Sequence, residues 1–167
     1  MGDVAPHVPN RPLFWPDFVA ILADALRDVD IPIYIVGGAV RDSYLHRPVK
    51  DIDLATPGDS IALSRRIAHI LDCDIFVMDD SRGVARLLID KSDGHLILDV
   101  ARFRSHDLFS DLADRDFTIN AMAVDLHGNL NLIIDPLNGA QDAEKKLIRR
   151  CSPSAIAADP IRAFRAA

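Results

Sequence analysis

The chain has 167 residues, of which 49% are hydrophobic and 26% are charged, and its formal net charge is −6. This length and composition are typical of one globular domain with a substantial core, and a disordered chain is not expected. The acidic balance argues against the chain alone gripping a long nucleic acid, because such binding depends on Lys and Arg that neutralise phosphates. It leaves open a small polyphosphate site in which metal ions supply the positive charge.

No apolar stretch reaches the length needed to cross a membrane, and the first twelve residues lack the charged and apolar regions of a signal peptide. Cys73 and Cys151 lie far apart and in no CxxC pattern, so neither a zinc site nor a disulfide framework is indicated. We therefore expect a cytoplasmic protein with no membrane partner.

The first half of the chain alternates between strand and helix patterns. Residues 1–11 are proline-rich and are expected to be loosely ordered, and apolar spacing predicts a helix over about 16–28. Further helices are expected at 38–46 and 60–71. Short apolar runs bounded by turn residues predict five strands, at 32–36, 51–55, 73–78, 84–89 and 96–101.

The second half is less regular. Residues 102–112 are expected to form a polar connection. The periodicity of 118–126 fits either a helix or a strand, and a helix is favoured for its early part. From Ser152 onward the pattern is helical, and Asp159-Pro160 begins a new helix. Because the sequence ends inside an amphipathic pattern, we expect it to be the N-terminal part of a longer protein.

The most informative segment is Tyr34-Ile-Val-Gly37-Gly38, a strand that runs into a helix and is followed by Asp51-Ile52-Asp53. Side chains alternate across a strand, so Asp51 and Asp53 share one face. Two such anions repel each other unless a cation lies between them, and Mg²⁺ with its oxygen ligands is the natural partner. The glycine pair lets the backbone approach a phosphate closely. A plain turn explains the glycines alone, and solvated carboxylates explain the aspartates alone, but their order favours nucleotidyl transfer.

Asp99 closes an apolar strand and is a candidate for the third carboxylate of a two-metal reaction. The alternative is an ion pair with Arg102 or Arg104. In that reaction one metal lowers the pKa of the attacking hydroxyl, and the other holds the triphosphate and stabilises the leaving pyrophosphate.

Two further groups of polar residues are candidates for nucleotide contacts. Arg115, Asp116 and Asn120 carry donors and acceptors suited to ribose and phosphate, although an ion pair at a helix start explains them in isolation. Asp159 and Arg162 share one helix face and form either a salt bridge or a donor–acceptor edge for a base.

The ordered motifs resemble those of the class II tRNA nucleotidyltransferase and bacterial poly(A) polymerase family, within the polymerase-beta-like superfamily. They are Gly37–Asp42, Asp51–Asp53, Arg115–Ala121, Asp135–Gly139 and Asp159–Arg162. The resemblance implies an α/β (α+β) head with a mixed, mostly antiparallel sheet of about five strands and flanking helices. It divides the chain into an N-terminal extension and helix (1–30), the head (31–145) and the start of a helical neck (146–167).

The resemblance also implies roles for single residues. By it, Asp51 and Asp53 are the Mg²⁺ ligands, Gly37, Gly38 and Arg41 lie beside the triphosphate, Arg115, Asp116 and Asn120 line the ribose and phosphate region, and Asp159 and Arg162 are the template that bonds the base of ATP or CTP. The segment Asp135–Gly139 is similar to the hinge between head and neck.

The implied function is template-independent addition of nucleotides from ATP, and possibly CTP, to an RNA 3′ end, with tRNA as the expected acceptor. The RNA would be bound mainly by domains outside this chain. Poly(A) or A-only addition is the first alternative, a nucleotide-binding module that no longer catalyses is the second, and an interaction domain with an acidic cation site is the third. The chain departs from the family at Asp114, where an arginine is usual, at Ala158, where a glutamate is usual, and in a shorter segment 104–111.

Overall fold

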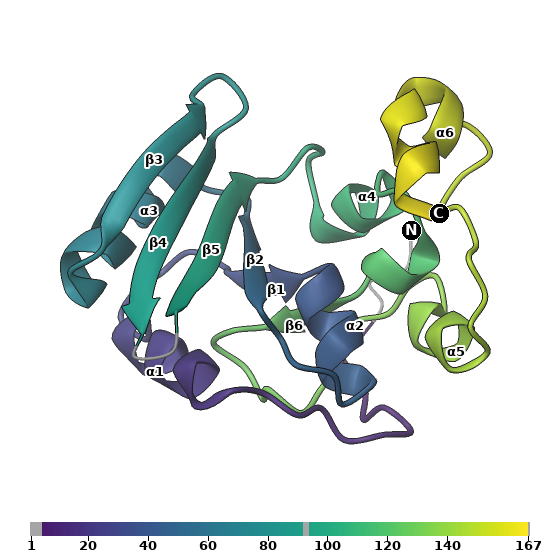
Figure 1. The fold of residues 1–167 in the computed structure, drawn as a ribbon, viewed down its shortest axis with the longest axis horizontal. Coiled ribbons are helices and arrows are strands. Elements are labelled where there is room, and N and C mark those ends of the chain that lie inside the picture. The colour runs from purple at the N-terminus through teal and green to yellow at the C-terminus, as the bar shows by residue number, and fades with distance from the viewer. Residues whose placement is uncertain (1–4, 92–93, 167) are drawn as a thin grey trace.

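A single six-stranded sheet organises the chain in the computed structural model, which describes residues 5–91 and 94–166 (Figure 1). The strand order is β3-β4-β5-β2-β1-β6. The strands are β1 (Tyr34–Val36), β2 (Asp51–Thr56), β3 (Asp74–Asp79), β4 (Val84–Lys91), β5 (Gly94–Arg102) and β6 (Ala123–Asp125). The helices are α1 (Asp17–Ala25), α2 (Gly38–Tyr44), α3 (Ser60–Leu71), α4 (Leu108–Ala113), α5 (Gly139–Glu144) and α6 (Ala155–Ala158), with 3-10 helices η1 (Thr118–Asn120) and η2 (Pro160–Ala166).

The sheet is mixed and mostly antiparallel, as the resemblance implied. Strands β2 and β5 at its centre run parallel, and the pairs β1–β2, β1–β6, β3–β4 and β4–β5 are antiparallel. The parallel pair sets Asp53 opposite Asp99 in register. Residues directly opposite each other on neighbouring strands point to the same face of a sheet. The topology therefore brings together two carboxylates that lie 46 positions apart in the sequence.

The larger hydrophobic cluster lies on one face of this sheet. A smaller cluster, which includes Val36 and Ala55, covers the other face at β1 and β2, and that face is open along β3, β4 and β5. Leu22 of α1, Ile67 of α3, Leu87 of β4 and Leu98 of β5 belong to one buried cluster. Figure 1 shows α3 behind β3 and β4, with no described helix in front of them. Along β4, Ala85, Leu87 and Ile89 are buried, whereas the residues between them are partly exposed. This alternation is typical of an antiparallel sheet with one face in water.

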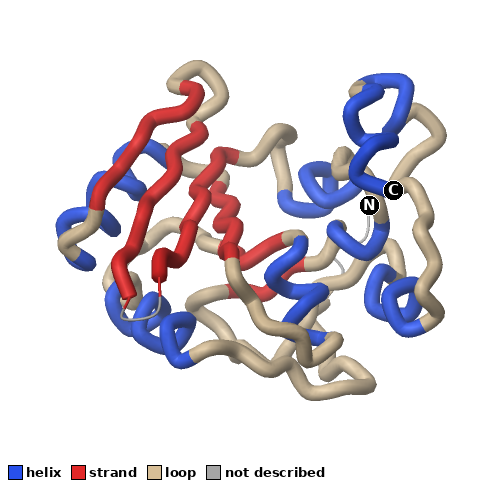
Figure 2. The backbone as a smooth tube through the Cα atoms, in the orientation of Figure 1, coloured by secondary structure: helices blue, strands red, loops and turns tan. Residues whose placement is uncertain are grey.

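Two of the predicted elements need correction, and one helix was not predicted. Residues 118–126 form the short helix η1 followed by the strand β6, so the favoured early helix is one 3-10 turn and the sheet gains a sixth strand. The polar connection expected at 102–112 contains α4, which begins because the Asp107 side chain accepts a hydrogen bond from Ser110 N at 2.7 Å. Helix α5, one of the blue helical segments of Figure 2, was not predicted, because its six residues give too little periodicity.

The two ends of the chain also differ from expectation. Residues 1–4 lie outside the described chain, but His7 pairs with Ile133 through backbone hydrogen bonds of 3.0 and 2.9 Å, so this part of the segment 1–11 is held in place. After Ser152 the chain forms α6, and a new helix does begin at Pro160, but as a 3-10 helix. Within the described residues, no helix is both long enough and apolar enough to span a lipid bilayer.

Helix α5 packs against η1 through close backbone and side-chain contacts. The Asp135 carboxylate accepts hydrogen bonds from Gly139 N at 2.7 Å and Ala140 N at 2.9 Å, which caps the helix. The buried Asp142 carboxylate accepts hydrogen bonds from Thr118 Oγ1 at 2.7 Å and Arg149 Nε at 3.0 Å. These bonds fix α5 to the turn that precedes β6.

After α5 the chain runs back along the segment before η1. Thr118 N donates to Arg149 O at 2.9 Å, and Cys151 N donates to Asp116 O at 3.0 Å. Phe117 and Arg150 form the bridge between these two bonds. Residues 149–151 therefore lie alongside 116–118 as a short antiparallel pair.

We expect Gly139→Ala to destabilise the fold, because an added Cβ would lie 2.1 Å from the Thr118 carbonyl oxygen. The backbone of η1 or α5 must shift, which costs about 1–3 kcal/mol or more. Gly128→Ala is the matched control, since its Cβ would meet nothing closer than the Asp125 side chain at 3.3 Å. Urea denaturation of both variants measures the difference, and equal midpoints for the two would contradict this packing.

We also expect Asp142→Asn to lower stability at neutral pH and to matter less in acid. Burial alone raises the pKa of Asp142, but the hydrogen bonds from Arg149 and Thr118 outweigh it, so the pKa lies below its usual value. Because its pKa is lower in the folded state, the ionised Asp142 carboxylate stabilises the fold fully above the unfolded-state pKa of about 3.9. This stabilisation is lost as the pH falls through the lower folded-state pKa. Denaturation at pH 7 is expected to show a loss of about 1–3 kcal/mol that shrinks below pH ~4. A pH-independent difference would refute this assignment.

Candidate active site

Strand β2 carries the two candidate metal carboxylates on its open face. Asp51 is exposed and Asp53 is half-buried, whereas Ile52 between them is fully buried on the opposite face. The alternation expected from the sequence is therefore the arrangement found. Because β2 lies between β1 and β5, side chains from both neighbouring strands reach Asp53.

Asp99 on β5 lies next to Asp53 but is already paired with a cation. Arg86 on β4 donates to both carboxylate oxygens of Asp99, from Nε and from Nη2, each at 2.8 Å. The partner is not Arg102, because residues three apart on a strand point to opposite faces, whereas Arg86 stands opposite Asp99 in register. Asp99 therefore stands beside the candidate metal carboxylates as half of a bidentate ion pair.

Gly37 forms the turn between β1 and α2 in a conformation that favours glycine, with φ of 75°. A Cβ at this position would lie 3.1 Å from Arg115 Nη1 and 3.4 Å from Asp53 Oδ2. The bare backbone thus lets a carboxylate from β2 and a guanidinium from the segment before η1 approach each other. Gly38 follows as the first residue of α2.

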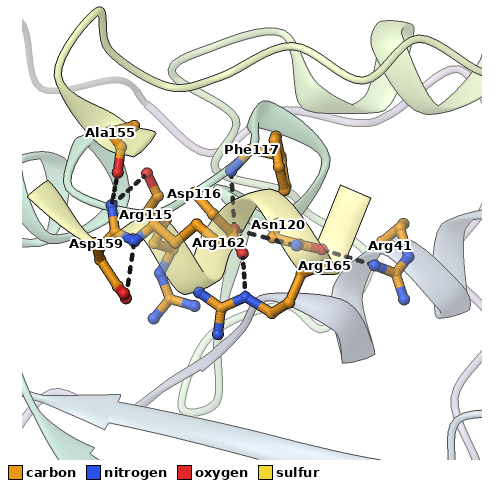
Figure 3. Close-up of polar contacts among 9 residues, drawn as sticks. All are labelled: Arg41, Arg115, Asp116, Phe117, Asn120, Ala155, Asp159, Arg162 and Arg165. Carbon is orange, nitrogen blue, oxygen red and sulfur yellow. Dashed lines mark hydrogen bonds and ion pairs between the residues drawn. The ribbon is translucent and has the colours of Figure 1, made fainter. Parts of the chain in front are cut away.

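Arg41, Asn120 and Asp116 form a chain of hydrogen bonds along one side of the site (Figure 3). Arg41 Nη1 donates to Asn120 Oδ1 at 2.7 Å, and Asn120 Nδ2 donates to Asp116 Oδ1 at 3.2 Å. Asp116 is nearly buried, and its second carboxylate oxygen lies 3.0 Å from Arg165 Nε. Arg41 also donates to both carboxylate oxygens of Asp42, at 2.9 and 3.0 Å. These contacts hold the amide and guanidinium groups in fixed positions.

Most of the predicted residues line one cavity of about 360 Å³. Its lining includes Gly37, Gly38, Arg41, Asp53, Asp99, Arg115, Asp116 and Asn120. Arg104 and Arg165, which the sequence analysis did not assign to the site, also line it. Arg165 follows Arg162 by three positions, a spacing that places both on one side of a helical turn, and this is the signal that could have found it.

Asp51, Asp159 and Arg162 lie outside the cavity lining. Arg162 Nε lies 3.5 Å from Asp159 Oδ2, and Arg162 Nη1 donates to Ala155 O at 3.2 Å (Figure 3). The same Nη1 reaches the backbone oxygen of Arg115 at 3.5 Å, so η2 is docked on the segment that carries Arg115. The pair sits beside the cavity, next to the guanidinium groups at its end.

Neighbouring charges and burial shift the pKa of two groups in the cavity. Burial raises the pKa of Asp53, the Asp99 and Asp51 carboxylates add to this, and the guanidinium of Arg115 opposes it. Desolvation, together with the positive charge of Arg115 and of Arg162 and Arg165 nearby, lowers the pKa of Arg104. Carboxylates and guanidiniums therefore lie side by side along the cavity, with Arg86 on Asp99, Arg115 near Asp53 and Arg165 on Asp116.

The donor set fits a hard divalent cation beside the carboxylates of β2. A cation between Asp51 and Asp53 would relieve the repulsion that helps to raise the pKa of Asp53. Within the described residues, no group of three or more His, Cys, Asp or Glu side chains is placed to hold one metal. The protein therefore offers two carboxylates to a cation. Two are enough for Mg²⁺, since this ion keeps water and substrate phosphates among its ligands.

Comparison with known proteins agrees with the motif resemblance. The family described as the poly A polymerase head domain matches residues 33–149. The CC-adding tRNA nucleotidyltransferase of Geobacter sulfurreducens is 40% identical over 147 residues, which are 88% of this chain and 33% of that protein. The multifunctional CCA protein of Legionella pneumophila strain Paris is 40% identical over 81% of this chain and 33% of its own length. The chain thus spans about one third of these curated relatives.

Solved structures give the same result. The Thermotoga maritima CCA-adding enzyme complexed with tRNA matches with a TM-score of 0.77 and 33% identity, over 90% of this chain and 36% of that one. A CCA-adding enzyme in complex with ATP matches with a TM-score of 0.78 and 31% identity, over the same shares. Because the family match covers more than half of the sequence, the chain belongs to the poly(A) polymerase head-domain family.

Proposed function

We propose that this chain is the catalytic head of an RNA nucleotidyltransferase that adds nucleotides from ATP, and from CTP, to the 3′ end of an RNA. The observation that carries the proposal is the single cavity shared by Asp53 and Asp99 with Arg41, Arg115 and Asn120. Carboxylates that suit a metal and guanidiniums that suit phosphates open into the same space. A nucleoside triphosphate with its metal is the ligand that needs both.

The residues of the chain divide the work of the reaction. The guanidiniums of Arg41 and Arg115, with the close-lying backbone at Gly37, hold the triphosphate. Asn120 and Asp116, which bond each other in the cavity lining, are assigned to the ribose hydroxyls because an amide and a carboxylate suit these groups. Asp51 and Asp53 are the residues that would hold Mg²⁺. When bound, Mg²⁺ supplies positive charge that favours ionisation of the RNA 3′-hydroxyl and departure of pyrophosphate.

The identity of the added nucleotides and of the RNA rests on the relatives. Those named above are CC-adding and CCA-adding tRNA enzymes, and solved relatives hold tRNA, ATP or CTP. We therefore propose tRNA as the acceptor and addition of part or all of the CCA end. The domains that hold most of the RNA are proposed to follow the head, with the neck beginning near residue 146. A cytoplasmic location remains a prediction.

A poly(A) polymerase is the second candidate, favoured by the family to which the chain belongs. A module that binds nucleotides without catalysis is less consistent with the site. Asp51 and Asp53 are both present and share one face, and a binder without chemistry has no need of the pair. Incorporation assays with each nucleotide separately distinguish the two enzymatic candidates.

We expect Asp53→Ala to reduce nucleotide incorporation by the complete protein on the order of 10²- to 10³-fold, because it removes a ligand of the reacting metal. The fold is expected to survive, since Asp53 lies on the open face of the sheet. Incorporation of labelled ATP and CTP into RNA measures the effect. Asp28→Ala, at an exposed carboxylate after α1, is the control. Turnover at the wild-type rate in the Asp53→Ala variant would contradict the assignment of Asp53 as a metal ligand.

Arg162→Ala is expected to reduce discrimination of ATP and CTP against GTP and UTP by roughly tenfold, because a bidentate side-chain contact to a base contributes about 1–3 kcal/mol of selectivity. Arg165→Ala serves as the comparison, since Arg165 pairs with Asp116 and lines the cavity. The Arg165→Ala variant should reduce incorporation of all four nucleotides to the same extent. Single-turnover incorporation with each nucleotide separates the two effects, and unchanged selectivity in Arg162→Ala would contradict the template role.

A further inference from the structure

The open face of the sheet continues from the carboxylates to an exposed aromatic residue. Asp53 stands opposite Asp99, Asp99 opposite Arg86, and Arg86 opposite Phe76, across β2, β5, β4 and β3. Partners in register share a face, so the four side chains form one row. Strands in a sheet lie about 4.8 Å apart, which puts Phe76 about 14 Å from Asp53. We call this row, with its neighbours Leu88 and Ile97, the acceptor face.

The acceptor face is exposed although it carries large apolar groups. Phe76 is 49% exposed, and Leu88 and Ile97 beside it are only partly buried. Val77, the next residue of β3, is 45% exposed and points to the other face of the strand. An exposed aromatic ring in line with a catalytic site is a candidate contact for a substrate.

The geometry of the reaction indicates from which side of β2 the RNA approaches. The groups that would hold the triphosphate, Gly37, Arg41 and Arg115, come from elements outside β5, β4 and β3, and Gly37 and Arg41 follow β1 directly in α2 and the turn before it. In an in-line displacement the attacking oxygen and the leaving oxygen lie on opposite sides of the phosphorus. The RNA hydroxyl therefore arrives from the β5 side, where Arg86 and Phe76 lie. Figure 1 shows α2 and β3 on opposite sides of β2.

We propose that the acceptor face binds the single-stranded 3′ end of the RNA and that Phe76 stacks on one of its last bases; this rests on the proposed function. Stacked nucleotides rise about 3.4 Å each, so Phe76 lies within the last few nucleotides from the reacting hydroxyl. Base stacking on an aromatic ring tolerates any base, which suits an end whose sequence changes as nucleotides are added.

The charges on this face favour a base over a phosphate. Asp51, Asp53, Asp74 and Asp99 all point to it, and Arg86 is engaged with Asp99. A phosphate backbone would meet mainly carboxylates, whereas the uncharged face of a base meets Phe76 and the aliphatic side chains of Leu88 and Ile97. Arg86 has five N–H groups, of which Asp99 accepts two, so it retains donors for the last phosphate.

The test compares Phe76→Ala, Phe76→Leu and Phe76→Trp with Val77→Ala, a matched control on the same strand with similar exposure and the opposite face. The complete protein is assayed with an RNA stem-loop that carries an unpaired 3′ end. We expect Phe76→Ala and Phe76→Leu to raise the KM for RNA roughly tenfold, the loss of one base–aromatic stack, with the KM for ATP unchanged. Phe76→Trp should match or improve on the wild type.

A KM for RNA in Phe76→Ala equal to that of Val77→Ala would overturn the proposal, and so would a wild-type KM in Phe76→Leu, which keeps the apolar area without the ring. Thermal melting of the same variants identifies any loss of folding. Fluorescence of a base analogue placed in turn at each of the last few positions of the RNA reports stacking without turnover. A wild-type protein that incorporates no nucleotide would refute the proposed function, whereas this binding signal and its dependence on Phe76 decide the present inference separately.

Discussion

Negative charge confined to one face of a sheet is the constraint on which the site depends. Parallel pairing of β2 with β5 puts Asp53 beside Asp99, and the alternation of β2 adds Asp51 to the same face. Carboxylates this close are tolerated because guanidiniums approach from both sides. Arg86 binds both oxygens of Asp99, and Arg115 reaches Asp53 over the bare backbone of Gly37. A larger residue at Gly37 would separate Arg115 from Asp53 and leave the repulsion unopposed.

Part of this arrangement follows from the sequence by local rules. A strand alternates every second residue, so the common face of Asp51 and Asp53 needs no tertiary information. The glycine turn and the five strand segments follow from similarly short patterns. The head fold itself was implied by the motif resemblance, which the family match confirms. Each of these inferences needs only a few neighbouring residues.

The rest of the fold and of the candidate site depends on contacts between residues that lie far apart in the sequence. Arg86 is an ordinary polar position on β4, and only the register of β4 with β5 brings it to Asp99. Arg104 reaches the cavity from a connection without a distinctive pattern, and Arg165 reaches it because the predicted helix after Asp159 folds back onto Asp116. Helices α4 and α5 have six residues each, so their stability comes from packing and caps rather than from periodicity.

The antiparallel pair of 149–151 with 116–118 has a mechanical consequence. Its backbone hydrogen bonds join the segment after α5 directly to Asp116, and the Asp116 carboxylate in turn bonds Asn120. A change in the direction of the chain beyond residue 151 would therefore act directly on the Asp116 and Asn120 side of the cavity. By thermodynamic linkage, a nucleotide that prefers one placement of Asp116 and Asn120 must also favour one orientation of the chain that follows.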